Sequence, residues 1–240
     1  MNSDRKIAII VGVLYIVGTV AGILWKVLTG SIQNDLNLLT KVTANENQII
    51  IGALFLLVMG LALAMVPVMM FPILKKHNEA LALGYIVFRG ALETVTYIAI
   101  VIGWLFLTIL GQHYIAGASD ASYFQTLGAL TLEGNVSIGI ISQFVFPLGA
   151  LMFYWVLYQA KLIPRWISGW GLISAILVLV FAFLYLFGIV AVKDVFDISI
   201  FLQEMVMAVW LIVKGFNPSA IASGSAKVDM NKGERNEFNQ

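Results

Sequence analysis

The 240-residue chain contains no cysteine, which excludes disulfide bonds, a thiolate nucleophile and any metal site with cysteine ligands. Charged residues are also scarce, at 11% of the chain, whereas they make up about a quarter of an ordinary soluble domain. Hydrophobic residues reach 60%, and the mean hydropathy is +0.94. This composition excludes a soluble globular protein and a disordered one. It indicates a polytopic membrane protein.

Apolar runs of about 20 residues, the length needed to cross a bilayer, occur six times along the chain. These candidate spans are Ile7–Trp25, Ile49–Met70, Ala80–Leu110, Ile138–Tyr158, Ile167–Val192 and Ile198–Phe216. The first is too long for a signal peptide and no A-x-A site follows it, so we expect it to be retained. We predict an all-α bundle of six transmembrane helices over residues 1–216, followed by a disordered cytoplasmic tail over residues 217–240.

The distribution of lysine and arginine predicts the orientation of these spans. One side of the alternating path carries ten cations: Arg5, Lys6, Lys75, Lys76, Lys161, Arg165, Lys214, Lys227, Lys232 and Arg235. The other side carries only three, which are Lys26, Lys41 and Lys193. Because cytoplasmic loops are enriched in lysine and arginine, we expect both termini in the cytoplasm.

The connection before the fourth span contains a further predicted helix. Residues Ala121–Leu132 have helical character, and Gly134 follows directly. A single helix from Asp120 to Tyr158 would be about 58 Å long. We therefore expect Gly134 to separate this helix from the fourth span.

Three ionisable residues stand out within the predicted spans: Arg89 and Glu93 in the third and Glu204 in the sixth. A charge at the centre of the bilayer costs about 2.5–3.5 kcal/mol, so each needs a physical reason. Arg89 and Glu93 are four residues apart and are expected to share one helix face. Tyr85, Thr96 and Tyr97 extend this face into a polar stripe.

A rise of about 1.5 Å per residue places the three charged residues at similar depths. If the third and sixth helices are neighbours, a Glu–Arg–Glu cluster can form. Such a cluster has one excess negative charge, so either one carboxylate keeps a proton or a cation balances it. The fourth helix adds a small, polar face at 3.6-residue spacing, made of Asn135, Gly139, Ser142 and Gln143.

Each of these residues also has a purely structural interpretation. Arg89 can extend its side chain to the cytoplasmic interface, because the third helix is long. Arg89 and Glu93 can form a pair that only holds the bundle together. Glu204 has no cation within one turn of its own helix, and its structural form is a protonated, hydrogen-bonded carboxyl group.

The motifs of intramembrane and soluble enzymes are missing. The chain has only two histidines, His77 and His113, on opposite sides of the predicted membrane, so they cannot share a zinc ion. It contains no H-E-x-x-H, G-x-S-x-G or Walker sequence. These absences argue against an enzyme, although a carboxylate and a tyrosine are able to carry out acid–base chemistry. We expect no metal and no cofactor. The net charge of +1 gives no reason to expect a nucleic-acid partner.

Several stretches have a distinctive sequence. They are RKIAIIVGVLYIVGTVAGIL (5–24), LTKVTANENQIIIGAL (39–54), LKKHNEALALGYIVFRGALE (74–93), GALMFYWVLYQAKLIPRWISGWGLI (149–173) and LQEMVMAVWLIVKGFNPSAI (202–221). Together they resemble the bacterial membrane-protein family catalogued as domain of unknown function 4386. The resemblance implies a multi-pass protein of the bacterial inner (plasma) membrane with a similar helical layout.

The resemblance also points to site residues. Relatives have Arg and Glu on the third helix and Gln-Glu on the sixth, which here correspond to Arg89, Glu93, Gln203 and Glu204. Ahead of the fourth helix, relatives have Arg-Asp and Trp before Gly-Asn. This chain reads TLEGNVSIG there, with Glu133 and no arginine. The departure argues against a site at the outer end of that helix.

Two functions remain open from the sequence. The first is transport or binding of a small molecule or ion, including proton-coupled transport. Its site residues would be Arg89, Glu93, Glu204, Gln143, Tyr97 and Gln203. The second is an accessory or structural membrane protein that acts through helix–helix partners. The lipid bilayer is the surrounding medium in both cases, and the sequence does not predict an oligomeric state.

Overall fold

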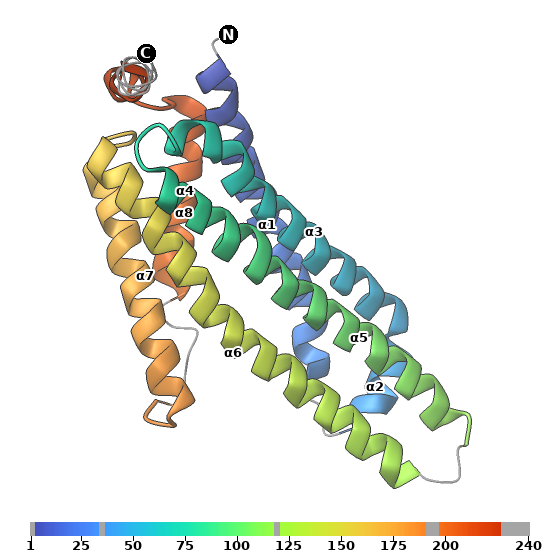
Figure 1. Cartoon of the computed structure of the whole chain (residues 1–240). Coiled ribbons are helices and arrows are strands. Elements are labelled where there is room, and N and C mark those ends of the chain that lie inside the picture. Colours follow the sequence, from blue (N-terminus) through green and yellow to red (C-terminus); the bar gives the residue numbers. More distant parts are fainter. Residues whose placement is uncertain (1–2, 34–36, 118–120, 191–196, 227–240) are drawn as a thin grey trace, which may run out of the picture. The chain divides into compact units, whose positions relative to one another are not determined.

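The computed structural model describes residues 3–33, 37–117, 121–190 and 197–226, which are helical and contain no strand (Figure 1). The elements are α1 (Ser3–Gln33), α2 (Leu38–Ala44), α3 (Glu46–Leu74), α4 (Glu79–Tyr85), the π-helix η1 (Ile86–Leu92), α5 (Glu93–Ile115), α6 (Ala121–Ala160), α7 (Arg165–Leu186) and α8 (Asp197–Val213). A further helix covers Pro218–Ala226. The predicted all-α class is therefore confirmed.

Five helical stretches are long and apolar enough to cross a membrane: α1, α3, the run Glu79–Ile115, α6 and α7. A sixth crossing is obtained if α8 and the helix Pro218–Ala226 are counted as one broken span. Only 22–44% of the most apolar window of each of the five is buried inside the protein, as expected for helices that face lipid. The chain is a multi-pass membrane protein with five or six candidate spans.

The prediction that Gly134 separates two helices is wrong, because α6 runs without interruption from Ala121 to Ala160. One glycine in a helix interior costs only about 1 kcal/mol relative to alanine, which is too little to break a long helix. No side chain lies within 4 Å of the position where a Cβ of Gly134 would be, so nothing else disturbs the backbone there.

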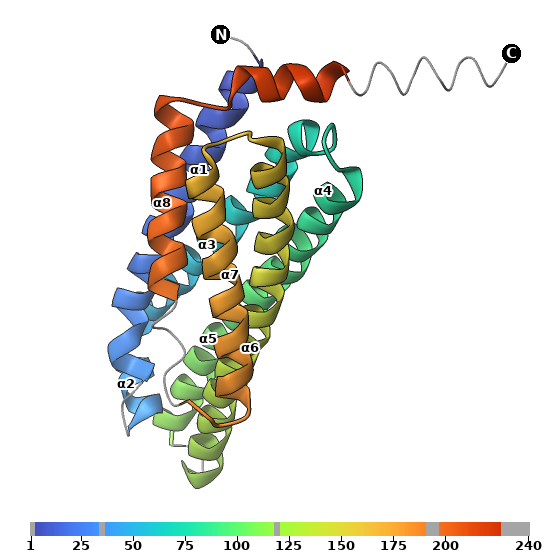
Figure 2. The same ribbon diagram turned by 90° about the vertical axis from the view of Figure 1, so that its left-hand side faces the viewer.

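The start of the predicted cytoplasmic tail also differs from expectation. Residues Pro218–Ala226 form a helix, bent by 84° from α8, which Figure 2 shows running sideways away from the end of α8. The Lys76 ammonium donates to the Ser225 hydroxyl at 3.2 Å, and Gly224 lies against the His77 ring. These contacts supply the tertiary packing that the polar composition of the tail did not predict. Residues 227–240 lie outside the described part of the chain.

The chain divides into two compact units. Unit 1 consists of Met1–Ile16, Leu63–Leu92 and Gln143–Gln240, and unit 2 consists of Val17–Ala62 and Glu93–Ser142. In unit 1, α7 and α8 pack against each other. In unit 2, α2 packs against α5. The apolar core of unit 2 is built from Ile32, Leu39, Val42, Ile49, Ala53, Leu56, Ile100, Val101, Trp104, Leu107 and Leu110.

Several hydrogen bonds join distant segments at one end of unit 1. Arg5 donates to the last carbonyls of α8, those of residues 211–213. The Asn217 backbone N–H donates to the Leu162 carbonyl at 2.9 Å. The hydrogen bond from Lys76 to Ser225 connects the turn between α3 and α4 to the same end. The start of α1 and the end of α8 therefore lie at the same end of unit 1.

The cations that the sequence assigns to the cytoplasmic side belong to the segments that meet at this end. The described ones are Arg5, Lys6, Lys75, Lys76, Lys161, Arg165 and Lys214, whereas Lys227, Lys232 and Arg235 lie outside the described residues. That this end faces the cytoplasm, with both termini inside, stays a prediction from the positive-inside rule.

Candidate functional site

Arg89 lies on the π-helix η1, a widened turn between α4 and α5. Short π-helical segments inside longer helices are rare and occur frequently at functional sites. Close packing surrounds this segment: a Cβ on Gly149 would lie 3.1 Å from the Arg89 backbone nitrogen, and one on Gly90 would lie 3.3 Å from the Pro67 ring. Small residues at both positions allow the helices of unit 1 to approach η1.

The Arg89 guanidinium is buried and paired with a carboxylate on α8. Its Nη2 donates to Oε1 of Glu204 at 3.1 Å, and the exposed fractions of the two side chains are 3% and 13%. The guanidinium also lies over the Phe146 ring, 4.5 Å from the ring centroid. The Arg89 side chain is thus enclosed by protein, and its depth in the bilayer stays a prediction. The pair is electrically neutral, which removes most of the reason for either charge to leave the low-dielectric interior.

Three tyrosines, Tyr15, Tyr85 and Tyr154, are buried in the same unit. The hydroxyls of Tyr15 on α1 and Tyr85 on α4 lie 3.3 Å apart, and either can be the donor. The Tyr85 ring stacks on Phe153, with centroids 4.5 Å apart and planes 10° from parallel. Each of these side chains is about 1% exposed. Phenol hydroxyls at this depth provide hydrogen-bonding groups in an otherwise apolar interior.

Gln203 is fully buried next to Glu204 in the sequence. Its amide oxygen accepts from the Tyr154 hydroxyl at 2.6 Å, and its amide nitrogen donates to the Ile167 carbonyl at 3.0 Å. These bonds tie α8 to α6 and α7. Gln203 therefore fixes the position of the α8 turn that carries the charged Glu204.

Gln143 does not contact the Arg89–Glu204 pair through any hydrogen bond that the structure shows. Its amide donates to the Asp197 carboxylate at 2.9 Å, at the first turn of α8. Two residues further along α8, the Ser199 hydroxyl bonds the Ser174 hydroxyl at 2.8 Å and accepts from the Trp170 indole at 3.1 Å. These polar contacts join α6 and α7 to the start of α8.

Glu93 and Tyr97 belong to unit 2. The Tyr97 hydroxyl donates to Oε1 of Glu93 at 2.5 Å, and the Glu93 side chain is 1% exposed. The Tyr97 ring lies against Gly60, where a Cβ would approach it to 3.2 Å. Within unit 2, Glu93 thus has a short hydrogen bond to its neighbour one turn away. The proposed three-membered cluster of Glu93 with Arg89 and Glu204 stays a prediction.

The polar face expected on the fourth helix is partly engaged in unit 2. The Asn135 amide donates to the Ile100 carbonyl at 3.3 Å. It lies so close to α5 that a Cβ on Gly103 would come within 2.0 Å of the Asn135 side-chain oxygen. Asn135 is therefore a packing contact between α6 and α5.

Sequence reasoning missed Tyr15, Tyr154 and Asp197. Tyr15 is the only tyrosine in α1, and a single tyrosine in an apolar span is a weak signal. Tyr154 and Gln203 are 49 residues apart, and no spacing rule connects them. Asp197 lies at the very start of its helix, so it did not count as a charge inside a span.

Together, unit 1 places one cation, one carboxylate, one buried amide and three phenols on η1 and the helices packed around it. The Arg89 guanidinium is suited to holding carboxylates, and in this structure it is paired with Glu204. Among the described residues, no group of three or more His, Asp or Glu is close enough to hold a metal ion.

Of the comparisons with known proteins, one identifies a family. The family model described as Domain of unknown function (DUF4386) matches residues 10–215, a range that includes Arg89, Gln203 and Glu204. No curated protein and no solved structure matches the chain. Because the matched range covers most of the 240 residues, this multi-pass membrane protein belongs to the DUF4386 family.

Proposed function

We propose that this protein binds a small anion within the membrane and carries it across in company with a proton. The observation that supports this is the buried ion pair between Arg89, on a π-helical turn, and Glu204 on α8. Intramembrane ionisable residues commonly mark proton relays and substrate pathways. The proposed place of work is the bacterial inner membrane.

The pair offers a simple exchange. When Glu204 takes up a proton it becomes neutral, and the Arg89 guanidinium is then released from its partner. A ligand carboxylate takes the place of Glu204 on Arg89, with the phenol hydroxyls of Tyr15 and Tyr85 as further hydrogen-bond donors in the same unit. Release of the ligand returns Arg89 to Glu204, and the proton leaves. One anion and one proton move together, so the charge within the cluster stays balanced.

Proteoliposomes containing the full chain test this proposal. A pH-sensitive dye is trapped inside, the outside is acidified, and a carboxylate that does not cross a protein-free bilayer is added, such as succinate, glutamate or gluconate. We expect proton entry that depends on one of these anions, and we expect Glu204→Gln to abolish it. Glu79→Gln, an exposed carboxylate in the first turn of α4, is the matched control and should leave the flux unchanged.

The second candidate is an accessory protein that acts through partner helices. Its support is the near-complete burial of Arg89, Gln203, Tyr15, Tyr85 and Tyr154, which is what a purely structural polar core requires. In that case no carboxylate in the panel produces proton entry, and Glu204→Gln lowers thermal stability and reduces recovery of a co-purifying membrane partner. Unchanged behaviour of Glu204→Gln in every assay would count against both candidates.

A further inference from the structure

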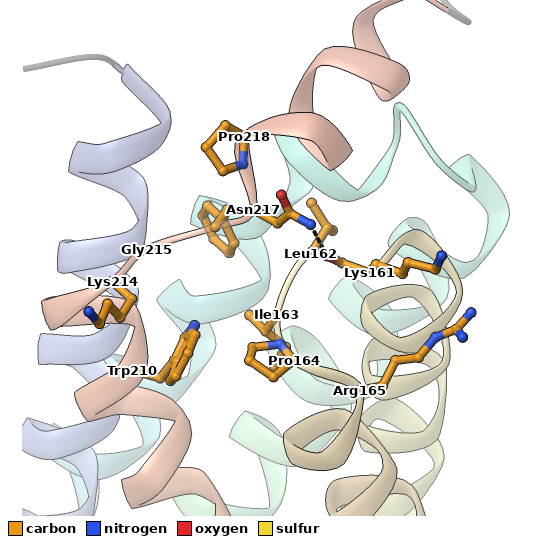
Figure 3. A pocket seen from close by; sticks show the side chains of 11 residues that line it. Lys161, Leu162, Ile163, Pro164, Arg165, Trp210, Lys214, Gly215, Asn217 and Pro218 are labelled. Atoms are coloured by element: carbon orange, nitrogen blue, oxygen red, sulfur yellow. Dashed lines mark hydrogen bonds between the residues drawn. The ribbon is translucent and has the colours of Figure 1, made fainter.

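A pocket of about 610 Å³ opens at the cation-rich end of unit 1, far in sequence from Arg89 (Figure 3). It lies between the α6–α7 turn, residues 161–165, and the segment that follows α8, residues 214–218. Figure 3 shows Trp210 and Lys214 on one side and Lys161 and Arg165 on the other, with Ile163 and Pro164 between them. A pocket of this size accommodates a small organic ligand.

The charge of the lining has one sign. Lys161, Arg165 and Lys214 all contribute to it, and no aspartate or glutamate does. Within the described part of the chain, none of these three cations forms an ion pair, and Arg165 lies over the Tyr158 ring, 5.1 Å from its centroid. Three exposed cations around one pocket, without a carboxylate between them, favour an anionic ligand.

The walls of the pocket are fixed to each other. The Asn217 backbone N–H donates to the Leu162 carbonyl at 2.9 Å, and the Asn217 side chain donates to the Lys161 carbonyl at 3.3 Å. Leu162 and Ile163 are almost fully buried, which anchors the turn from below. Hydrogen bonds thus fix the two sides of the pocket relative to each other, which lowers the entropy cost of ordering the pocket when a ligand binds.

Lys161 adopts a backbone conformation that a lysine rarely takes. Its φ of 55° is the only positive φ of a non-glycine residue in the described chain. It follows the end of α6, and the Leu162 N–H donates to the Leu157 carbonyl at 3.2 Å, as in a Schellman motif. Glycine is the usual residue at this position because it has no Cβ. A lysine held there against local strain indicates a use for its side chain.

We propose that this pocket binds the phosphate group of an anionic ligand through Lys161, Arg165 and Lys214. Basic pockets at the cytoplasmic ends of transmembrane helices are suited to phosphate-bearing lipid headgroups. Trp210 lines the pocket, and Trp166 is 58% exposed one residue beyond Arg165. Indole rings at this level are typical of the membrane interface, where such headgroups lie. A soluble phosphate compound has the same recognition chemistry.

Binding to the purified full chain in mild detergent tests the site. The ligands are phosphatidylglycerol, phosphatidylcholine, glycerol 3-phosphate and inorganic phosphate. Their binding is measured by native mass spectrometry and by the change in the melting temperature of the protein. The double variant Lys161→Gly/Lys214→Gln removes two pocket cations and relieves the strain at position 161. Lys75→Gln is the matched control, because Lys75 lies at the same end of unit 1, over the Phe71 ring and outside the pocket.

We expect wild-type protein to retain phosphatidylglycerol in preference to phosphatidylcholine, and the double variant to bind it about 30-fold more weakly. The control should bind as the wild type does, and the double variant should melt at the same temperature as the wild type or higher. Binding of glycerol 3-phosphate or inorganic phosphate with the same loss supports a soluble ligand instead of a lipid. An equal loss in Lys75→Gln, or no binding of any phosphate compound, overturns the proposal.

Discussion

Arg89 and Glu204, 115 residues apart in the sequence, form an ion pair at 3.1 Å inside a unit made of membrane-spanning helices. An unpaired charge is costly in such an interior, and pairing lowers this cost for both residues. The pair also joins a π-helical turn to α8. In the proposed function, exchange of this contact makes Arg89 available to a ligand.

Neutralising one partner should destabilise the protein. Glu204→Gln leaves the Arg89 charge buried without its carboxylate, and we expect the free energy of unfolding to fall by about 3 kcal/mol. This is the lower end of the usual range, because Glu204 is 13% exposed. Unfolding in mixed micelles measures it, with Glu79→Gln as the control for loss of an exposed carboxylate. Equal stability of the two variants would show that the pair contributes nothing to the fold.

Two glycines in helices of unit 2 should respond in opposite ways to alanine. Gly103→Ala places a Cβ within 2.0 Å of the Asn135 side chain, so we expect a loss of about 1–3 kcal/mol in stability. Gly134→Ala meets nothing within 4 Å and should stabilise α6 by up to about 1 kcal/mol. Thermal unfolding of the two variants in the same detergent gives the comparison. Similar shifts for both would contradict the close contact at Gly103.

The hydrogen bonds from Arg5 should hold the end of α8. Its guanidinium donates to three carbonyls that no residue of α8 itself can satisfy, while Gly215, with φ of 76°, turns the chain away beneath it. Arg5→Ala should lower stability by about 1–2 kcal/mol, because charged hydrogen bonds are lost at a partly exposed site. Lys6→Ala is the matched control. Hydrogen exchange should localise the change to residues 211–213, and protection there equal to wild type would refute the capping role.

The absence of cysteine makes the orientation directly measurable. Ala222→Cys and Ala116→Cys each introduce the only thiol in the chain at an exposed position. If both termini are cytoplasmic, an impermeant thiol reagent applied to intact cells labels Ala116→Cys but not Ala222→Cys. Permeabilised cells should label both. The reverse pattern would invert the proposed orientation.

Much of the helix arrangement could be predicted from the sequence, because charged side chains are costly in lipid and cations are concentrated on one side of a membrane. The cations near residues 5, 76, 161 and 214 predicted segments on one side, and those segments meet at one end of unit 1. Arg89 and Glu204 were conspicuous because charge is expensive in lipid. By contrast, the 3.6-residue spacing used to align Arg89 with its neighbours does not apply inside a π-helix.

Other features leave no readable trace in the sequence. Tyr154 and Gln203 meet only because α6 and α8 pack together, and neither residue type is unusual in a membrane protein. The continuity of α6 through Gly134 depends on the absence of any competing contact. The helix Pro218–Ala226 contacts Lys76 through Ser225, a residue 149 positions away in the sequence.

The central claim is that the Arg89–Glu204 pair is kept for activity and not for stability alone. The double variant Arg89→Met/Glu204→Met tests it, because replacing a buried ion pair by apolar side chains of similar volume is often neutral or stabilising. Its melting temperature and its anion-dependent proton entry are measured on the same proteoliposome preparation. We predict a melting temperature within a few degrees of wild type and complete loss of proton entry. Proton entry at the wild-type rate in a stable double variant would contradict the account.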